Sequence, residues 1–397
     1  MSIAETKADE TAPVRQVLFS KPDVGEEEIA ALTAAVRSGW LTVGPRTHEF
    51  EQTFAKWTGV DHAVAVSSCT AALHLALDAL GIGPGDEVIT STLTFAATGA
   101  TIIHVGARPV LVDSSPDTLN LDPDDVARKV NKRTRAIVPV HFAGHPAPMD
   151  EIGAIAQTHD LSVVEDAAHA LPASYRGKRI GSVSEVTAFS FYATKNLTTG
   201  EGGMLTLRDA QVAERARTRR LHGMSKDAWK RYSAKGAWRY DVSYPGFKYN
   251  MTDPAAAMGL VQLKRMPDLQ RRRLQLVALY ERALADVPQI RRPIARPEVE
   301  SAWHLYAVRL RPERLRVHRD DVIELLRERG VGSSVHFIPL HLHSYYRDAF
   351  GYTPEDFPVA SDAADTLISL PLYTLMSDED VAYVADNLRQ VLADNSR

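Results

Sequence analysis

The chain has 397 residues, a formal net charge of −4, and 45% hydrophobic and 24% charged residues. This length exceeds one ordinary core and predicts two domains, and the small net charge gives no reason to expect nucleic acid or a membrane as partner. The single cysteine, Cys69, excludes an internal disulfide framework and fits a cytoplasmic location.

Neither targeting nor metal-binding patterns are found along the chain. No apolar run approaches the ~20 residues that cross a bilayer. Residues 1–15 have no apolar core of the kind found in a secretory signal, and residues 1–20 are expected to be a disordered lead-in. The histidines are scattered without the spacing of metal ligands, so no metal is expected.

Helices and short apolar strands alternate in the first half of the chain. Helical spacing of apolar residues predicts two helices, over 26–38 and 47–58. Strands are expected over 62–66, 86–90, 108–113, 135–142 and 161–165 and from 186, and helices over 71–80, 95–104, 123–130 and 149–159. Such alternation predicts an α/β fold with a mostly parallel sheet, whose ligands lie at the carboxyl ends of its strands.

The second half begins with a helix over 208–221 and a long polar stretch over 222–248, of a length that is usually functional. A long helix from about 255 to 287 and a proline-rich linker over 288–297 come next. Further elements are expected over 303–310 (strand), 319–329 (helix), 330–332 (a glycine turn), 334–337 (strand) and 378–392 (helix). The pattern predicts a large domain over 21–260 and a small C-terminal α+β domain over 261–397, which the long helix joins.

Lys195 stands on a polar turn after the strand that begins at Val186, and the glycines of 200–203 follow it. Lysine is the side chain that forms a Schiff base with an aldehyde cofactor, and it does so when deprotonated and held in place. The glycines allow a second backbone or a flat ligand to approach closely. A solvated loop lysine is the simpler reading, unless other parts of a cofactor site accompany it.

Pyridoxal phosphate (PLP) requires such a lysine and a carboxylate at its pyridine nitrogen. Asp166 directly follows its strand and supplies this carboxylate, and the ion pair would keep its pKa low. His169 can bond the phenolic oxygen of the ring, and Phe95 offers an aromatic face for stacking.

The phosphate group of PLP also finds a predicted site. Ser68 and Thr70 lie between a strand and the start of a helix, where backbone amides and the helix dipole attract anions. Ser190 adds a hydroxyl five residues before Lys195. The agreement of all these requirements predicts a PLP enzyme.

Five motifs carry a resemblance to a known family: 39–45 (GWLTVGP), 68–73 (SCTAAL), 165–169 (EDAAH), 190–196 (SFYATKN) and 246–253 (GFKYNMTD). From about Trp40 to its end, the chain resembles the nucleotide-sugar aminotransferases of the DegT/DnrJ/EryC1/StrS family. The resemblance implies the architecture of aspartate aminotransferase, known as PLP fold type I.

Residue roles follow from the resemblance. Lys195 would be the Schiff-base lysine and proton shuttle, and Asp166, His169 and Phe95 would hold the ring. The phosphate would be bound by Ser68, Thr70, the backbone amide of Ala71, Ser190 and, from the other subunit of a homodimer with shared sites, Asn250. Contacts to the substrate are expected from Thr42, Gly44, Arg220, His222, His336 and His341.

The implied reaction is a ping-pong transamination from L-glutamate, or glutamine, to a nucleotide-linked keto sugar, with pyridoxamine phosphate (PMP) as the intermediate form. Residues 336–341, followed by Tyr345 and Tyr346, are more similar to the members that aminate C4, which points to a dTDP-4-keto sugar. Resemblance to actinomycete enzymes suggests a deoxyamino sugar of antibiotic or other natural-product biosynthesis.

Three alternatives stay open. A PMP-dependent sugar dehydratase of the same family would carry histidine in place of Lys195. A non-catalytic regulator on this fold could lose Lys195 or Asp166 freely and usually carries a DNA-binding domain. An enzyme acting on amino acids alone would need an arginine in the small domain, where His336 and His341 stand instead.

Overall fold

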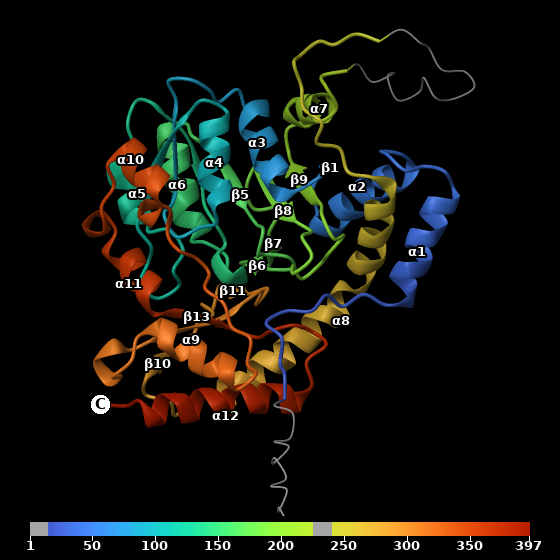
Figure 1. Cartoon of the computed structure of the whole chain (residues 1–397). Coiled ribbons are helices and arrows are strands. Elements are labelled where there is room, and N and C mark those ends of the chain that lie inside the picture. The colour runs from blue at the N-terminus through green and yellow to red at the C-terminus, as the bar shows by residue number, and fades with distance from the viewer. Residues whose placement is uncertain (1–14, 225–239) are drawn as a thin grey trace, which may run out of the picture.

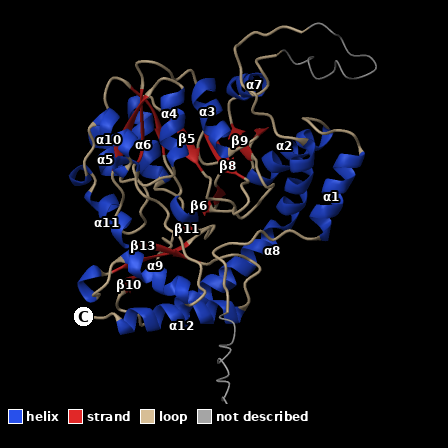
Figure 2. Ribbon diagram, viewed as in Figure 1, coloured by secondary structure: helices blue, strands red, loops and turns tan. Residues whose placement is uncertain are grey.

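The protein is described here by a computed structural model, which covers residues 15–224 and 240–397. Its centre is a seven-stranded sheet of order β1-β9-β8-β5-β4-β2-β3 (Figures 1 and 2). The strands are β1 (His62–Val66), β2 (Glu87–Ser91), β3 (Arg108–Val112), β4 (Thr134–Val138), β5 (Ser162–Asp166), β8 (Val186–Ser190) and β9 (Gly203–Leu207). β2, β3, β4, β5 and β8 pair in parallel, and β9 runs antiparallel to both β1 and β8. The predicted α/β fold with a mostly parallel sheet is confirmed.

Helices cover both faces of this sheet because its strands alternate apolar side chains between two cores. One core joins the sheet to α3 (Cys69–Ala79), α4 (Ala96–His104) and α7 (Ala210–Arg219). The other core joins it to α2 (Pro45–Thr58), α5 (Pro123–Lys129), α6 (Met149–His159) and the first half of α8 (Asp253–Ala283). In β1, for example, Val64 belongs to the first core and Ala65 to the second.

α8 continues into a separate C-terminal core, seen below the sheet in Figure 1. There it packs against α12 (Asp378–Asp394), and α12 packs against α9 (Arg319–Glu328). A three-stranded sheet of order β10-β12-β13 completes this core, from β10 (Ile290–Arg291), β12 (Tyr306–Leu310) and β13 (Leu367–Leu370). The remaining elements are α1 (Glu26–Arg37), which packs on α8, α10 (Ser344–Phe350), α11 (Pro358–Thr366) and the short strands β6 (Ser174–Tyr175), β7 (Lys178–Arg179) and β11 (Val299–Glu300).

Some predicted elements differ from the structure. Residues 334–337 form no strand and make a single isolated bridge, because this segment turns toward the cavity described below. The strand expected from residue 303 begins at Tyr306, since Trp303 takes a positive φ of 48°. The strands β6, β7, β9, β10, β11 and β13 were not predicted, and β10 lies within the expected linker.

The expected disordered lead-in differs from the structure over residues 15–20. Val17 is 2% exposed and pairs in parallel with Val331 of the C-terminal core. Residues 1–14 lie outside the described residues, as do residues 225–239 of the polar stretch 222–248. None of the described helices is long and apolar enough to cross a membrane.

Candidate active site

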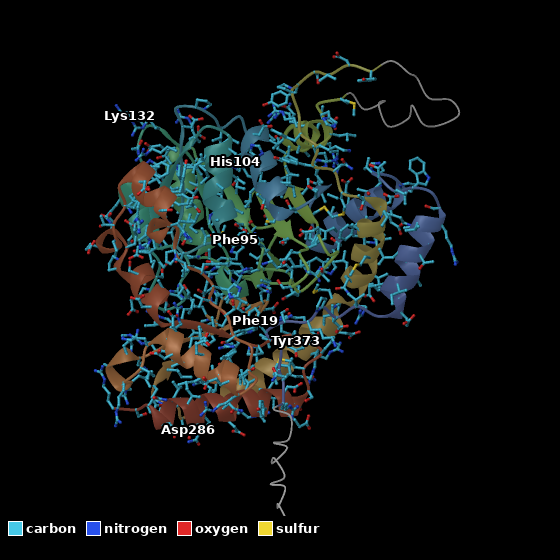
Figure 3. All side chains as sticks on the ribbon, in the orientation of Figure 1. Phe19, Phe95, His104, Lys132, Asp286 and Tyr373 are labelled. Carbon is cyan, nitrogen blue, oxygen red and sulfur yellow. The ribbon has the colours of Figure 1, made fainter. Side chains whose placement is uncertain are left out.

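A cavity of about 440 Å³ opens at the carboxyl ends of β5 and β8, between the large sheet and the C-terminal core. Figure 3 shows Phe95 and Phe19 in this region. Eight of the predicted site residues line it together: Ser68, Thr70, Phe95, Asp166, His169, Ser190, Lys195 and His336. The fold therefore brings most of the residues predicted from the sequence into one cavity.

Lys195 lies half-buried on the turn after β8, where its backbone amide donates to the carbonyl of Tyr192 at 2.9 Å. Burial lowers the pKa of Lys195 to about 8, although the nearby Cys69 and Asp166 oppose this shift. An appreciable fraction of this lysine is therefore neutral near pH 7 to 8, and a neutral amine is the form that attacks an aldehyde.

Asp166 ends β5 and is almost completely buried. Its carboxylate accepts hydrogen bonds from the hydroxyl of Thr98 at 2.7 Å and from the amide of Ala168 at 3.1 Å. Burial raises the pKa of Asp166 despite these bonds and the charge of Lys195. The low pKa expected for this carboxylate therefore depends on a cation beside it, which the pyridinium nitrogen of PLP would provide.

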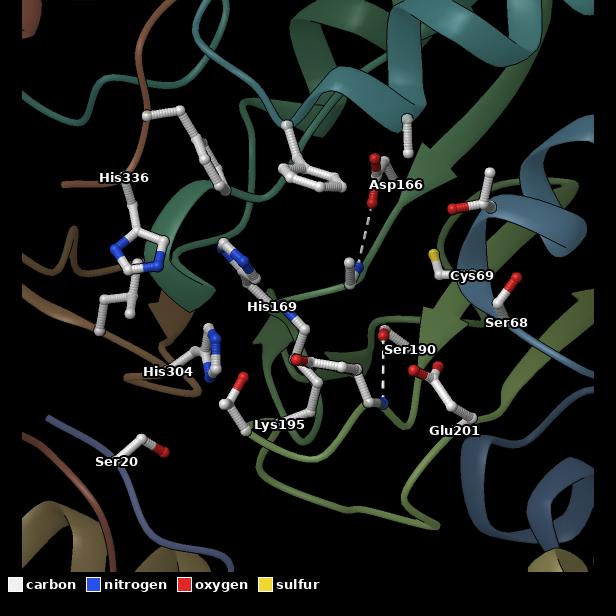
Figure 4. A pocket seen from close by; sticks show the side chains of 18 of the residues that line it. Ser20, Ser68, Cys69, Asp166, His169, Ser190, Lys195, Glu201, His304 and His336 are labelled. Carbon is white, nitrogen blue, oxygen red and sulfur yellow. Dashed lines mark hydrogen bonds between the residues drawn. The ribbon is translucent and has the colours of Figure 1, made fainter. Parts of the chain in front are cut away.

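The N-terminus of α3 forms one end of the cavity. Ser68 caps this helix, and its hydroxyl accepts from the amide of Ala71 at 3.0 Å. Hence the Ala71 amide predicted to bind phosphate already has a partner. A side chain at Gly203 would lie 2.6 Å from the backbone of Ser68, which explains why glycine follows the lysine turn. In Figure 4, Ser68, Ser190 and Glu201 lie on one side of Lys195.

His169 lies on the other side of the cavity, buried between two rings. Its ring is 4.4 Å from that of His304 and stacks at 5.6 Å on that of Phe337. Burial holds the pKa of His169 well below its ordinary value, with Lys195 adding to the effect. Its Nδ1 atom is buried without a hydrogen-bond partner, as expected if a ligand supplies one.

Two predicted substrate contacts have other roles in the structure. Arg220 is buried and forms an ion pair with Glu51 and a 2.7 Å hydrogen bond to the carbonyl of Ala65. His341 is fully buried, and its ring nitrogens lie 2.7 Å from the hydroxyl of Thr92 and 2.9 Å from that of Ser361. Neither lines the cavity, because both are used in packing the fold.

The other four candidates also lie outside the cavity lining. Thr42 and His222 are exposed. Gly44 is buried at the start of α2, where an added side chain would lie 2.7 Å from the carboxylate of Asp253. Asn250 is half-buried, and its amide donates to the hydroxyl of Thr42 at 3.4 Å. Within one chain these residues reach no part of the cavity.

Sequence reasoning missed several lining residues, among them Phe19, Ser20, Tyr192, Glu201 and His304. His304 is 6% exposed, and its Nδ1 lies 3.1 Å from the side-chain oxygen of Asn196, next to Lys195. His304 was not recognised because residues 303–310 were expected to form a strand. Phe19 and Ser20 lay within the expected lead-in and carried no motif.

The model of the DegT/DnrJ/EryC1/StrS aminotransferase family matches residues 22–389. The chain belongs to this family. SpsC of Bacillus subtilis (strain 168), a spore coat polysaccharide biosynthesis protein, is 51% identical over 375 residues, covering 94% of this chain and 96% of SpsC. The membership confirms the predicted family and a PLP-dependent aminotransferase activity.

Solved structures of family enzymes support the same conclusion. Spr1654 from Streptococcus pneumoniae, assigned as a sugar aminotransferase, is 36% identical in its PMP form, with a TM-score of 0.90 over 96% of this chain and 100% of that one. It is also known in a PLP form. DesV from S. venezuelae, in complex with a ketimine intermediate, is 37% identical, with a TM-score of 0.84 over 92% of this chain and 94% of DesV.

The cofactor of this aminotransferase is PLP, with PMP as its aminated form, and the cavity fits it. Lys195 with its lowered pKa, the buried carboxylate of Asp166 and the unpartnered Nδ1 of His169 match an aldehyde, a pyridine nitrogen and a ring oxygen. At the other end, Ser68, Thr70 and Ser190 surround the start of α3, where a phosphate is favoured.

Proposed function

We propose that this aminotransferase moves an amino group from L-glutamate to a nucleotide-linked keto sugar in two half-reactions. The observation that carries the proposal is the half-buried Lys195 in one cavity with Asp166 and His169, in a chain that belongs to this aminotransferase family. PLP supplies the carrier for the amino group and the electron sink for the reaction. The sugar is supported by the relatives, since Spr1654 is assigned as a sugar aminotransferase and SpsC acts in polysaccharide biosynthesis.

The side chains of the cavity divide the work. Lys195, as a neutral amine, would carry the proton that leaves the donor carbon, and it would hold PLP in the resting enzyme. Asp166 would keep the pyridine nitrogen of PLP protonated, while the hydroxyl of Thr98 fixes the direction of its carboxylate. His169 would orient the phenolic oxygen of PLP, Phe95 would stack on its ring, and Ser68, Thr70 and Ser190 would bind its phosphate. His336 faces the space left for the substrate.

The proposed acceptor is a dTDP-4-keto sugar, which would give a 4-amino sugar. The motif over 336–341 supports it, and the structure brings His336 and Phe337 of that motif into the cavity lining. The proposed pathway is that of a deoxyamino sugar for natural products, in the cytoplasm.

A homodimer with shared sites is part of the proposal. Phe95 and Tyr192 line the cavity but are 61% and 48% exposed, and Leu41 of the family motif is 58% exposed. A second copy covering this face would bury them and close the site. In such a dimer Asn250, which does not reach the cavity of its own chain, would reach the cofactor phosphate of the partner, and Thr42, Gly44 and His222 would lie near the shared entrance.

The test is stepwise assay of the two half-reactions. The PLP-loaded enzyme should consume L-glutamate and yield 2-oxoglutarate and the PMP form, which then aminates a nucleotide-linked 4-keto sugar. Amination at C3 would refute the position, and an enzyme that dehydrates the sugar without consuming glutamate would favour the dehydratase. Lys195 argues against that alternative, because the dehydratases carry histidine there.

A further inference from the structure

The segment over residues 15–23 lines the cavity through Phe19 and Ser20, and it had no predicted function. We call the side of the cavity near His304 and His336, away from Ser68 and Ser190, the substrate end. The amide of Val17 donates to the carbonyl of Gly330 at 2.8 Å, and the amide of Gly332 donates to the carbonyl of Val17, also at 2.8 Å. These bonds add the segment to the edge of the C-terminal core as a short parallel bridge with Val331. We call residues 15–23 the N-terminal strap.

The glycine turn over 330–332 is shaped for this strap. A side chain at Gly332 would lie 2.6 Å from the amide nitrogen of Phe19, and one at Gly330 would lie 2.1 Å from the carbonyl oxygen of Arg15. Gly330 also has a positive φ of 71°, which other residues rarely adopt. The close approach of the strap therefore requires both glycines.

Both ends of the strap are fixed by charged side chains. Arg15 pairs with Asp380 of α12 at 2.5 Å and lies over the ring of Tyr383. Asp23 pairs with Arg265 of α8 at 2.6 Å and accepts from the hydroxyl of Thr374 at 2.8 Å. Phe19 and Ser20, between these anchors, are thereby held against the cavity (Figures 3 and 4).

Phe19 fixes a histidine of the cavity. Its ring stacks on that of His336 with centroids 5.5 Å apart and an interplanar angle of 22°. The Nδ1 atom of His336 lies 3.0 Å from the hydroxyl of Ser369. Together these contacts hold the plane of the imidazole and leave its other nitrogen for a ligand.

Ser20 adds a hydroxyl to the same end of the cavity. Among the described residues nothing bonds to this hydroxyl, and in Figure 4 it lies on the side of His304, opposite Ser68 and Ser190. The described lining contains no arginine. Within this chain, a donor α-carboxylate at this end of the cavity would therefore meet uncharged hydrogen-bond donors.

We propose that Phe19 and Ser20 determine specificity for the amino donor: the Ser20 hydroxyl binds the donor α-carboxylate, and Phe19 positions the imidazole of His336 beside it. This inference rests on the proposed transfer from an amino acid and assigns the donor subsite to the strap. The acceptor sugar carries no α-carboxylate, so its binding should depend less on the Ser20 hydroxyl.

The first test compares Ser20→Ala with Leu18→Ala, a matched control on the same strap whose side chain is 56% exposed and does not line the cavity. Because a hydrogen bond to a carboxylate is lost, Ser20→Ala should raise the KM for L-glutamate about tenfold. Its kcat and the KM for the keto sugar should stay within about twofold, and Leu18→Ala should match the wild type. An unchanged glutamate KM, or an equal rise for the sugar, overturns the proposal.

The second test needs no turnover and follows the titration of His336 by NMR in the cofactor-free protein. Burial, with the charge of Lys195, lowers the pKa of His336 to about 4, and His169 and His304 are the other titratable groups that face it. Phe19→Ala opens one face of the ring to water, so the pKa should rise toward the ordinary value of about 6.5, and Phe19→Tyr should restore it.

An unchanged titration in Phe19→Ala overturns the positioning role of Phe19. If the wild type fails to convert L-glutamate, the proposed function fails, and the titration still decides whether the strap controls His336.

Discussion

The two ends of the active-site cavity are built in different ways. At the cofactor end, Ser68 and Thr70 sit at the start of α3, and Asp166 and Ser190 sit at the ends of neighbouring strands, so each group belongs to one short motif. At the substrate end, Ser20, His304 and His336 come from three segments far apart in the chain. Each group at the first end is placed by its own short motif, whereas the second end forms where the strap and the C-terminal core meet the large sheet.

This difference suggests that substitutions at the two ends have separate consequences. A strand end fixes the direction of a carboxylate or lysine through the sheet, which has buried layers on both faces. The segments around His304 and His336 are irregular, so substitutions there alter the cavity without disturbing the sheet. Variants at the two ends should therefore affect different steps.

Lys195 lies between the two ends, and its loss should have the largest effect. Lys195→Ala should lower both half-reactions by about a thousandfold or more, because no other lysine lines the cavity in the described part of the chain. Lys264→Ala is the matched control, since Lys264 is exposed on α8 and makes only a 3.4 Å pair with Glu27. Substantial activity in Lys195→Ala, measured as 2-oxoglutarate formed, would contradict the assignment.

Arg220 tests whether a residue that does not line the cavity still contributes to substrate binding. Replacing it with methionine should cost about 3 to 5 kcal/mol of unfolding free energy, because Glu51 would remain buried without its cation. Burial alone would raise the pKa of Glu51, yet Arg220 and hydrogen bonds lower it to about 2. The stabilisation is thus present above the unfolded carboxyl pKa of about 4.3 and is lost as pH falls toward 2.

The control for Arg220→Met is Arg46→Ala, which removes an exposed 2.6 Å pair with Glu49 and should cost less than about 1 kcal/mol. Chemical denaturation at pH 7 and pH 4 measures both variants. An Arg220→Met protein of normal stability with a raised sugar KM would restore the substrate contact expected from the sequence.

Ser190→Ala sharpens the comparison at the cofactor end. The loss of one hydroxyl from the proposed phosphate site should weaken PLP binding about tenfold, while the glutamate KM at saturating PLP stays unchanged. This pattern is the reverse of that expected for Ser20→Ala. Ser182→Ala is the control, since its hydroxyl donates to the carbonyl of Arg179 outside the cavity. PLP titration by fluorescence measures the affinity of each variant for PLP. An equal loss of affinity in Ser190→Ala and Ser182→Ala would contradict a phosphate-binding role of Ser190.

The residues of the cofactor end could be predicted from the sequence because they directly follow strands. Strands are recognised by their alternating or continuous apolar residues, and the turns after them by their small and polar residues. The sequence did not predict β9, although the glycines before it were recognised as a place of close approach. It also could not separate Arg220 and His341, which bond inside the fold, from residues that face a ligand. Those distinctions depend on tertiary partners such as Glu51 and Thr92, which no local pattern reveals.

At the substrate end, even fewer residues could be predicted from local sequence patterns. His304 lies where a strand was expected, and the positive φ of Trp303 breaks that strand. Ser20 lies in a stretch whose composition indicated disorder, but the pairing of Val17 with Val331 orders it. Long-range contacts override local propensity in both cases.

The smallest expected effect concerns the pH at which the cofactor-free protein takes up PLP. Because burial lowers the pKa of Lys195 to about 8, its neutral fraction is about one tenth at pH 7 and about nine tenths at pH 9. The rate of PLP uptake, followed by absorbance, should therefore rise about ninefold over this range and level off above pH 9.

An ordinary lysine would behave differently, since a pKa of about 10.4 gives a rise of nearly a hundredfold from pH 7 to pH 9 without levelling off. Asp166→Asn provides the second arm, because the negative charge of Asp166 raises the pKa of Lys195. Its removal should move the midpoint below pH 8. A midpoint that stays in place would mean that Asp166 is protonated in the cofactor-free protein, in line with the direction in which burial shifts its pKa.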